Sequence, residues 1–118
     1  MKKPFDLMVR TRLFAKNVGE YVSKLPRTAA NANSSTQLIR SSSSVAANYL
    51  EAVDNLGRRD FLMKLRIARR EARESELWLD LSICNQDQLQ PKQELRAEAE
   101  ELVKILGAMI RKADAGPR

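Results

Sequence analysis

The sequence predicts an all-α protein, an antiparallel up-down-up-down four-helix bundle that forms a single domain over residues 1–118. Three observations support this class. Apolar residues recur at three- and four-residue steps along most of the chain, Gly and Pro number only four each, and the links between the periodic segments are short. A chain of this length buries roughly 65% of the surface that its unfolded form exposes, which is enough for one core.

The first two helices are expected over residues 5–25 and 34–56. The first carries apolar residues at helical spacing, and Pro26 ends it. Ser, Thr and Asn fill the link that follows, and these residues cap helix N-termini. Four consecutive serines, Ser41 to Ser44, are typical of a linker. The apolar rhythm nevertheless continues through them from Leu38 to Val45, so we expect a helix whose small side chains allow close packing.

The third and fourth helices are expected over residues 59–84 and 91–113. Asp60 suits the start of the third helix, and Pro91 suits the first turn of the fourth. Glutamates gather in the first half of the fourth helix, whereas Arg111 and Lys112 stand at its end. This order complements the helix dipole.

Missing residue types argue against an enzyme. The chain has no histidine, and Cys84 is its only cysteine. Nucleophilic triads that use histidine and the usual zinc sites therefore cannot form, so we expect no catalytic residues, no metal and no cofactor. No run of 18 apolar residues occurs and the first residues are highly charged. We therefore expect a cytoplasmic protein without a membrane span or signal peptide.

The charge balance indicates an anionic partner. Lys and Arg total 21 against 15 Asp and Glu, which gives +6. Such a surplus suits nucleic acid, an anionic membrane surface or an acidic protein, although it also lies within the range of an ordinary soluble domain.

Arginines form a patch on the third helix. On a wheel of 100° per residue, Arg59, Arg70 and Arg73 lie within about 40° of Arg66, away from the apolar face. Guanidinium groups suit phosphate. The alternatives are a solvated face or salt bridges between subunits to acidic residues of the fourth helix. Further candidates for nucleic-acid contact lie on the first helix, at Arg10, Arg12 and Lys16.

Two strips are candidate interfaces. Ser44, Asn48 and Glu51 belong to a polar stripe on the second helix, which is either a recognition surface or a seam where helices or subunits hydrogen-bond. A second apolar strip on the third helix indicates an oligomer interface. It consists of Ile67, Trp78 and Leu81.

Two carboxylates, Glu71 and Glu74, lie on one strip of the third helix. Paired carboxylates can serve acid–base or metal chemistry. Because the chain lacks histidine and arginines lie nearby, we expect interhelical ion pairs instead.

Most of the chain, and most densely residues 37–81, resembles the four-helix-bundle family named for proteins encoded in intervening sequences of bacterial 23S ribosomal RNA genes. The residues that carry the resemblance are Gln37, Leu38, Arg40, Ser41, Ser44, Val45, Ala47, Asn48, Glu51, Phe61, Leu65, Ile67, Ala68, Glu71, Ala72, Glu74, Trp78 and Leu79. The chain departs from the family pattern at Tyr49 and Ala52, where an aliphatic residue and a glycine are frequent.

The resemblance implies a bundle that assembles as a homopentamer. It also implies a relative, the accessory variability determinant of diversity-generating retroelements, which works with a reverse transcriptase and RNA. Together with the charge pattern, it favours a non-enzymatic oligomer that binds RNA or another nucleic acid through phosphates. The alternative is a structural adaptor that docks an acidic protein or a reverse-transcriptase-like partner.

Overall fold

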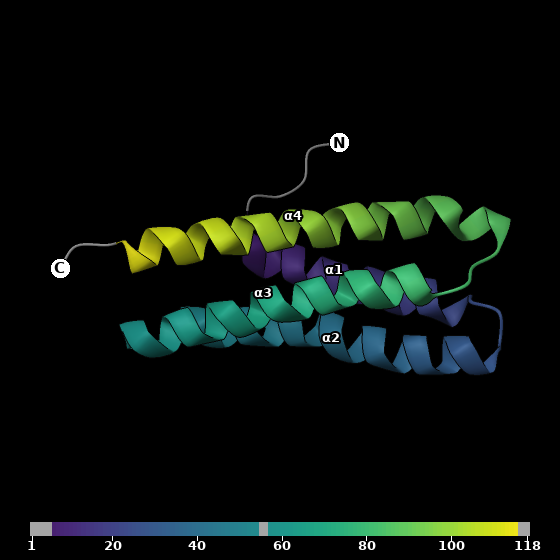
Figure 1. The fold of residues 1–118 in the computed structure, drawn as a ribbon, viewed down its shortest axis with the longest axis horizontal. Coiled ribbons are helices and arrows are strands. Elements are labelled where there is room, and N and C mark those ends of the chain that lie inside the picture. Colours follow the sequence, from purple (N-terminus) through teal and green to yellow (C-terminus); the bar gives the residue numbers. More distant parts are fainter. Residues whose placement is uncertain (1–5, 55–56, 116–118) are drawn as a thin grey trace.

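A computed structural model describes residues 6–54 and 57–115, and these residues form a four-helix bundle with extents of 52 × 31 × 19 Å (Figure 1). The helices are α1 (Leu7–Ser23), α2 (Ala29–Asp54), α3 (Arg58–Leu81) and α4 (Leu89–Asp114). A short 3₁₀ turn, Gln86–Gln88, precedes α4. No strand occurs in the described ranges, so the predicted all-α class is confirmed.

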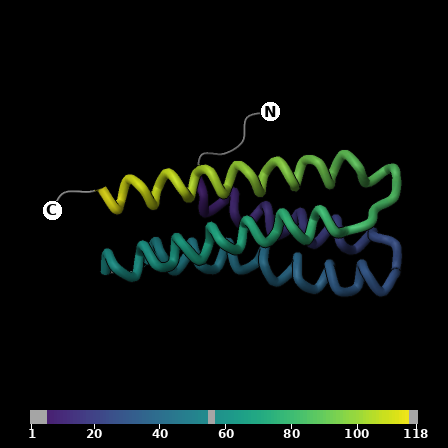
Figure 2. The backbone as a smooth tube through the Cα atoms, viewed as in Figure 1, coloured from purple at the N-terminus to yellow at the C-terminus, as the bar shows by residue number. Residues whose placement is uncertain are grey.

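Contacts between neighbouring helices show that they alternate in direction. Ser41 of α2 meets Ser75 of α3, whereas Asn31, ten residues earlier on α2, bonds to Ile83 beyond the end of α3. The contacts Arg66–Asp114 and Glu76–Arg96 show that α3 and α4 are antiparallel. The contacts Arg10–Glu98 and Tyr21–Gln88 show the same for α1 and α4. In the backbone tube, the α1–α2 and α3–α4 links lie at one end of the bundle (Figure 2).

All four helices contribute side chains to one core. Its largest fully buried apolar members are Phe14, Val18, Leu38, Val45, Leu65, Leu79, Leu102 and Leu106. The serine run is helical, as predicted, and Ser41 and Ser42 are both fully buried. Ser41 Oγ lies 2.8 Å from Ser75 Oγ, so the serines bring α2 and α3 together through a buried hydrogen bond.

The helix ends differ from the predicted ones for local reasons. α1 runs over Leu7–Ser23, and Asp6 caps it by accepting a hydrogen bond from the Met8 N–H at 2.9 Å. α2 starts at Ala29, five residues before the predicted start at 34. Thr28 supplies the cap, because its hydroxyl accepts the Asn31 N–H at 3.1 Å. Residues 5, 55 and 56, which the predicted helices included, lie outside the described residues.

The observed end of α3 and the observed start of α4 also differ from the predicted ones. α3 ends at Leu81 because Ser82 adopts an extended backbone, with φ −68° and ψ 142°. The predicted continuation to residue 84 does not occur, and Ile83 is 58% exposed. α4 begins at Leu89, so Pro91 still lies in its first turn, where a backbone N–H has no partner within the helix. None of the described helices combines the length and apolar character needed to cross a membrane.

Candidate nucleic-acid interface

Charge is separated along α3 and α4. Seven Lys and Arg stand against two acidic residues between Arg58 and Arg73, and three acidic residues with no basic one follow between Glu74 and Leu81. α4 has the opposite order, with four acidic and two basic residues over 89–103, then three basic and one acidic over 104–114. Because the two helices are antiparallel, their basic halves lie side by side. We call residues 58–73 and 104–114 the basic end.

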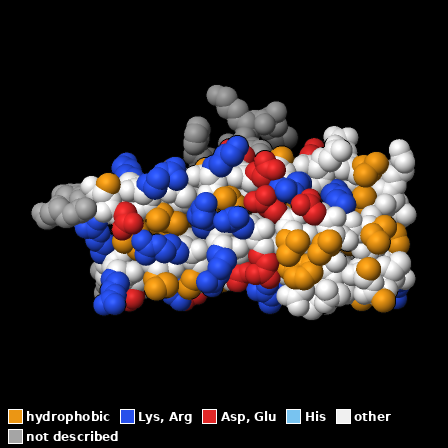
Figure 3. All heavy atoms as spheres, viewed as in Figure 1, with side chains coloured by type: hydrophobic (Ala, Val, Ile, Leu, Met, Phe, Trp, Pro, Cys, Tyr) orange, Lys and Arg blue, Asp and Glu red, His pale blue; other side chains and the backbone are white. Residues whose placement is uncertain are grey.

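The space-filling view shows this separation on one face of the molecule. Lys and Arg side chains cover one half of the face, a band of Asp and Glu crosses its middle, and apolar side chains lie beyond the band (Figure 3). The face therefore offers an anion one strongly attractive end rather than a uniform surface.

The predicted arginine patch lies at the basic end and is exposed. Its members, Arg59, Arg66, Arg70 and Arg73, are called the arginine stripe below. Arg66 Nη2 lies 3.2 Å from Asp114 Oδ2, but both side chains are about half exposed, so the pair contributes on the order of 1 kcal/mol or less. The other three have no carboxylate within salt-bridge distance among the described residues.

Carboxylates of the acidic half, in contrast, form ion pairs with arginines within the bundle. Arg96 contacts Glu76, Asp80 and Glu100 at 2.6, 2.8 and 2.8 Å. Its hydrogen bond to Asp80 is the main cause of a raised pKa of the Arg96 guanidinium. Carboxylates on this face thus have an arginine partner within the bundle, whereas most of the arginine stripe has no carboxylate partner.

Glu71 and Glu74 pair with one arginine of the neighbouring helix. Arg40 Nη1 lies 3.3 Å from Glu71, and Arg40 Nη2 bonds to Glu74. The predicted interhelical ion pairs are therefore confirmed. No group of three or more Asp, Glu or Cys side chains that could hold a metal ion occurs in the part of the chain that the structure describes.

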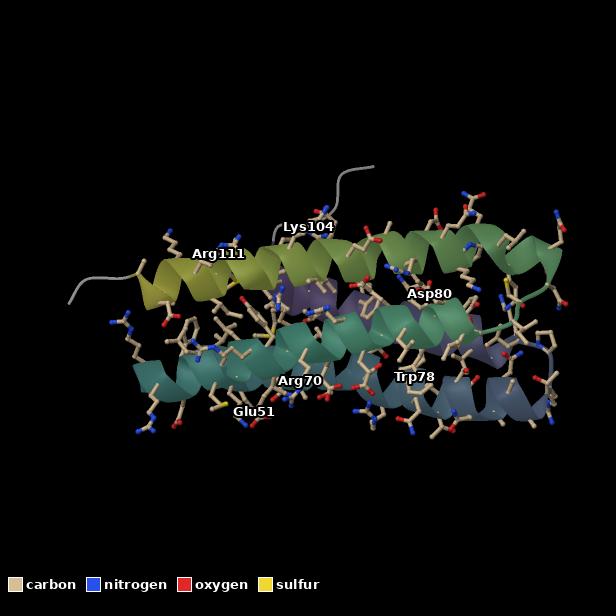
Figure 4. The ribbon with its side chains drawn as sticks, viewed as in Figure 1. Glu51, Arg70, Trp78, Asp80, Lys104 and Arg111 are labelled. Atoms are coloured by element: carbon tan, nitrogen blue, oxygen red, sulfur yellow. The ribbon has the colours of Figure 1, made fainter. Side chains whose placement is uncertain are left out.

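Three further cationic residues of the basic end were not among the candidates predicted from the sequence. Lys104 and Arg111 are exposed on α4, the helix beside α3, whereas Arg70 is exposed on α3 (Figure 4). Arg69 is half-buried and lies across α4 at Gly107, where an ideal Cβ would be 3.2 Å from its Nε. Only the pairing of α3 with α4 brings these residues together, and helical periodicity within one helix cannot show it.

The three candidates on α1 separate into two environments. Arg12 and Lys16 are exposed. Arg10 is only 7% exposed and donates from Nε and Nη2 to Glu98 at 3.0 and 2.7 Å. This hydrogen-bonded fork raises the pKa of Arg10. The Arg10 guanidinium is buried, and its donors are already bonded to Glu98. Arg10 is therefore not available to contact a phosphate.

A cavity of about 720 Å³ lies between α1 and α4. Its charged lining consists of Arg10, Glu20, Lys24, Asp87, Glu94 and Glu98. Acidic residues outnumber basic ones there, and Arg10 is already paired with Glu98. The cavity is therefore a poor site for phosphate, and the arginine stripe is the better one.

The polar candidates on α2 bond within the subunit. Asn48 Nδ2 donates to the carbonyl and the hydroxyl of Ser44, both at 2.9 Å, and Glu51 pairs with Lys64 of α3 at 2.9 Å. Within this polar stripe of α2, Ser41 forms the buried hydroxyl–hydroxyl hydrogen bond to α3, through Ser75.

The apolar candidates on α3 lie at the edge of the core. Ile67 and Trp78 are half-buried, and Trp78 Nε1 donates to Glu74 at 3.1 Å. Leu81 is 52% exposed, and Leu77 beside it is 49% exposed. Together with Trp78 these leucines leave an apolar surface next to the acidic band.

The sequence and the fold can be compared with known proteins. The family described as 23S rRNA-intervening sequence protein matches residues 4–108. The chain belongs to this family. The match includes the whole of α1, α2 and α3 and most of α4, so the α3 half of the candidate interface lies within it, whereas residues 109–114 of the α4 half lie beyond it.

A solved structure supports the family fold. The chain is similar to a protein of unknown function from the S23 ribosomal protein family of Bacteroides thetaiotaomicron VPI-5482, with 27% identity and a TM-score of 0.76. The similarity covers 89% of this chain and 98% of the other. No match was found among curated proteins. Family membership therefore establishes the fold, and the argument for function depends on the surface.

Proposed function

We propose that this protein is a non-enzymatic, oligomeric helical-bundle protein whose basic end binds RNA or another nucleic acid through backbone phosphates. The observation that carries the proposal is the contrast between the two halves of the α3–α4 face. Glu74, Glu76, Asp80 and Glu100 of the acidic half form ion pairs with Arg40 or Arg96, whereas Arg59, Arg70 and Arg73 have no described carboxylate partner. Like charges four residues apart on a helix cost a few tenths of a kcal/mol per pair, and an external polyanion offsets that cost.

The dimensions of the arginine stripe suit a nucleic-acid backbone. Arg73 lies fourteen positions after Arg59, which corresponds to about 21 Å along the helix axis. A stripe of that length can contact several phosphates of one strand. Arginine can donate two parallel hydrogen bonds to each phosphate.

Base reading has no comparable support. All described aromatic side chains are buried or half-buried, and Trp78 lies in the acidic half of α3 rather than among the arginines. A surface that reads single-stranded bases presents exposed aromatic side chains on which the bases stack. We therefore expect contacts that fix position and affinity without selecting sequence.

A second candidate function is docking of an acidic protein or a reverse-transcriptase-like partner. One observation favours it: Met63 and Leu77 are 53% and 49% exposed and lie beside the arginine stripe on α3. Protein interfaces commonly combine an apolar centre with a charged rim. Binding that persists at physiological salt to one acidic protein, and not to RNA, would favour this alternative.

Exposed apolar residues also support self-association, and we propose a homo-oligomer, specifically a pentamer. Ile39, Leu50 and Val53 are between 37% and 49% exposed along one strip of α2. The surface formed by Leu77, Trp78 and Leu81 is a second such feature. Contiguous apolar surface on a small domain commonly marks an interface. The number five comes from the family resemblance.

The experiment compares two variants that lose the same charge on different helices. Arg66→Gln/Arg70→Gln/Arg73→Gln removes three cations from the arginine stripe, and Arg12→Gln/Lys16→Gln/Lys24→Gln removes three from α1 and its end. Binding to several single-stranded RNAs of unrelated sequence is followed by fluorescence anisotropy. The proposal predicts that the stripe variant loses at least tenfold more affinity than the α1 variant for every RNA. Equal losses, or a larger loss in the α1 variant, would contradict it.

A further inference from the structure

The basic end contains the one buried polar side-chain atom that lacks a hydrogen-bond partner in the described part of the chain. This atom is Nε of Arg69. A buried N–H without an acceptor is costly and is rare in folded proteins, particularly when the group is charged. The bundle therefore holds a guanidinium donor in place without supplying its acceptor.

Gly107 explains how Arg69 reaches this position. An ideal Cβ at Gly107 would be 3.2 Å from Arg69 Nε, which is tighter than ordinary contact. Because glycine has no side chain, Arg69 lies directly across the α4 backbone. An alanine at this position would force the guanidinium to shift.

A second guanidinium converges on the same place. Nη1 of Arg111, which follows Gly107 by about one turn, is 3.4 Å from the same Cβ position. Arg69 and Arg111 form no salt bridge with any described carboxylate. On α4, Lys104 lies about one turn before Gly107, and on α3, Arg73 lies about one turn after Arg69. Like charges repel, so this convergence favours an anion between the two guanidiniums.

We infer that Arg69 and Arg111, seated around Gly107, form a clamp for one phosphate group of a nucleic acid. Because Arg69 Nε has almost no exposed surface, the guanidinium turns outward to meet the phosphate. A phosphate oxygen then gives Nε the acceptor that the bundle does not provide, and charge-assisted bonds to two guanidiniums fix the group between α3 and α4. The clamp rests on the proposed function in taking its phosphate from a nucleic acid. It goes further by assigning a specific phosphate site, at Arg69 and Arg111, whose residues do not belong to the arginine stripe.

The direct test uses inorganic phosphate and the Arg Nε–Hε signals in NMR spectra of the intact protein. The Arg69 signal is assigned by its loss in Arg69→Lys. Phosphate is titrated against sodium chloride at equal ionic strength. The clamp predicts a saturable shift of the Arg69 signal with phosphate and none with chloride. Chloride producing the same shift, or all arginine signals moving together, would overturn the inference.

Two variants locate the site and use the same readout. Arg111→Lys keeps the charge but loses the planar fork, so phosphate affinity at Arg69 should fall about tenfold. Gly107→Ala should displace Arg69 Nε by a few tenths of an ångström and weaken phosphate binding by a smaller factor, with helix content checked by circular dichroism. Arg12→Lys on α1 is the matched control and should leave the titration unchanged. Unchanged phosphate affinity in both clamp variants would also overturn the inference.

RNA binding separates this inference from the proposed function. If wild-type protein fails to bind RNA although phosphate saturates Arg69, the proposed function fails and with it the nucleic-acid source of the phosphate, whereas the phosphate site between Arg69 and Arg111 stands. If RNA binding depends on the arginine stripe but Arg69 does not respond to phosphate, the clamp fails and the proposed function stands. The same RNA with a 5′-phosphate and with a 5′-hydroxyl distinguishes a terminal phosphate from an internal one. Tighter binding of the first identifies the terminal group as the one in the clamp.

Discussion

Tyr21 shows, at the scale of one residue, how this small core accommodates a polar group. Its ring is 4% exposed, and its hydroxyl lies 2.7 Å from Ser82 Oγ. Burial disfavours the phenolate and raises the pKa of Tyr21 to about 12, from an ordinary value near 10. The neutral phenol is therefore part of the folded structure.

This raised pKa predicts a loss of stability at high pH. Above pH 10 the unfolded chain releases the phenol proton while the folded protein keeps it, so the free energy of unfolding falls as pH rises through about 12. At pH 11 wild type should have lost about 1 kcal/mol relative to Tyr21→Phe, measured by urea denaturation at pH 9 and 11. A constant difference between the two proteins over this range would show that Tyr21 titrates normally.

The sequence could not assign environments to single charges on α1. Arg10 and Arg12 are two residues apart, yet Arg10 is buried against Glu98 and Arg12 is exposed. Periodicity gives the angle of each side chain around its own helix. It does not show which neighbouring helix supplies a carboxylate, and that neighbour decides whether the cation is available to a ligand.

At the scale of the helices, the long apolar periodicity predicted where each helix lies, but it did not predict the residues at which the helices begin and end. The apolar rhythm through the serine run predicted that α2 continues there, because burial of one face outweighs the weak helix propensity of serine. The ends depend on single hydrogen bonds and backbone angles, such as the cap at Thr28 and the extended Ser82. Neither has a periodic signal in the sequence.

The serine run carries a prediction about packing. Ser42 is fully buried, so Ser42→Leu should overpack the core and lower the free energy of unfolding by roughly 1–3 kcal/mol. Ser43 next to it is exposed, and Ser43→Leu should change stability by about 0.5 kcal/mol or less. Urea denaturation measures both. Similar small effects at the two positions would contradict the close packing of α2.

At the scale of the whole molecule, the candidate site depends on pairing between helices. The arginine stripe was predictable because all four members lie on one helix at helical spacing. The cluster of Arg69, Gly107 and Arg111 was not, since it arises where antiparallel α3 and α4 meet in a particular register. The family pattern indicates the bundle but does not give this register residue by residue.

Self-association is a second property of the whole molecule that can be tested. Trp78→Glu places a charge on the apolar surface beside Leu77 and Leu81, and charge at the centre of an interface is strongly disfavoured. Light scattering should show an oligomer for wild type and a smaller particle for the variant, with helix content retained. A wild-type mass that stays at 13.4 kDa at high protein concentration would contradict the oligomer.

The central claim is that the arginine stripe binds nucleic acid by contacting phosphates. The most direct measurement is the slope of log Kobs against log salt concentration for one single-stranded RNA, in wild type and in Arg66→Gln/Arg70→Gln/Arg73→Gln. Each lost phosphate contact should reduce the magnitude of the slope by about 0.7, so the triple variant should differ by about 2. An unchanged slope and affinity, in a variant that keeps its helix content and mass, would contradict the claim.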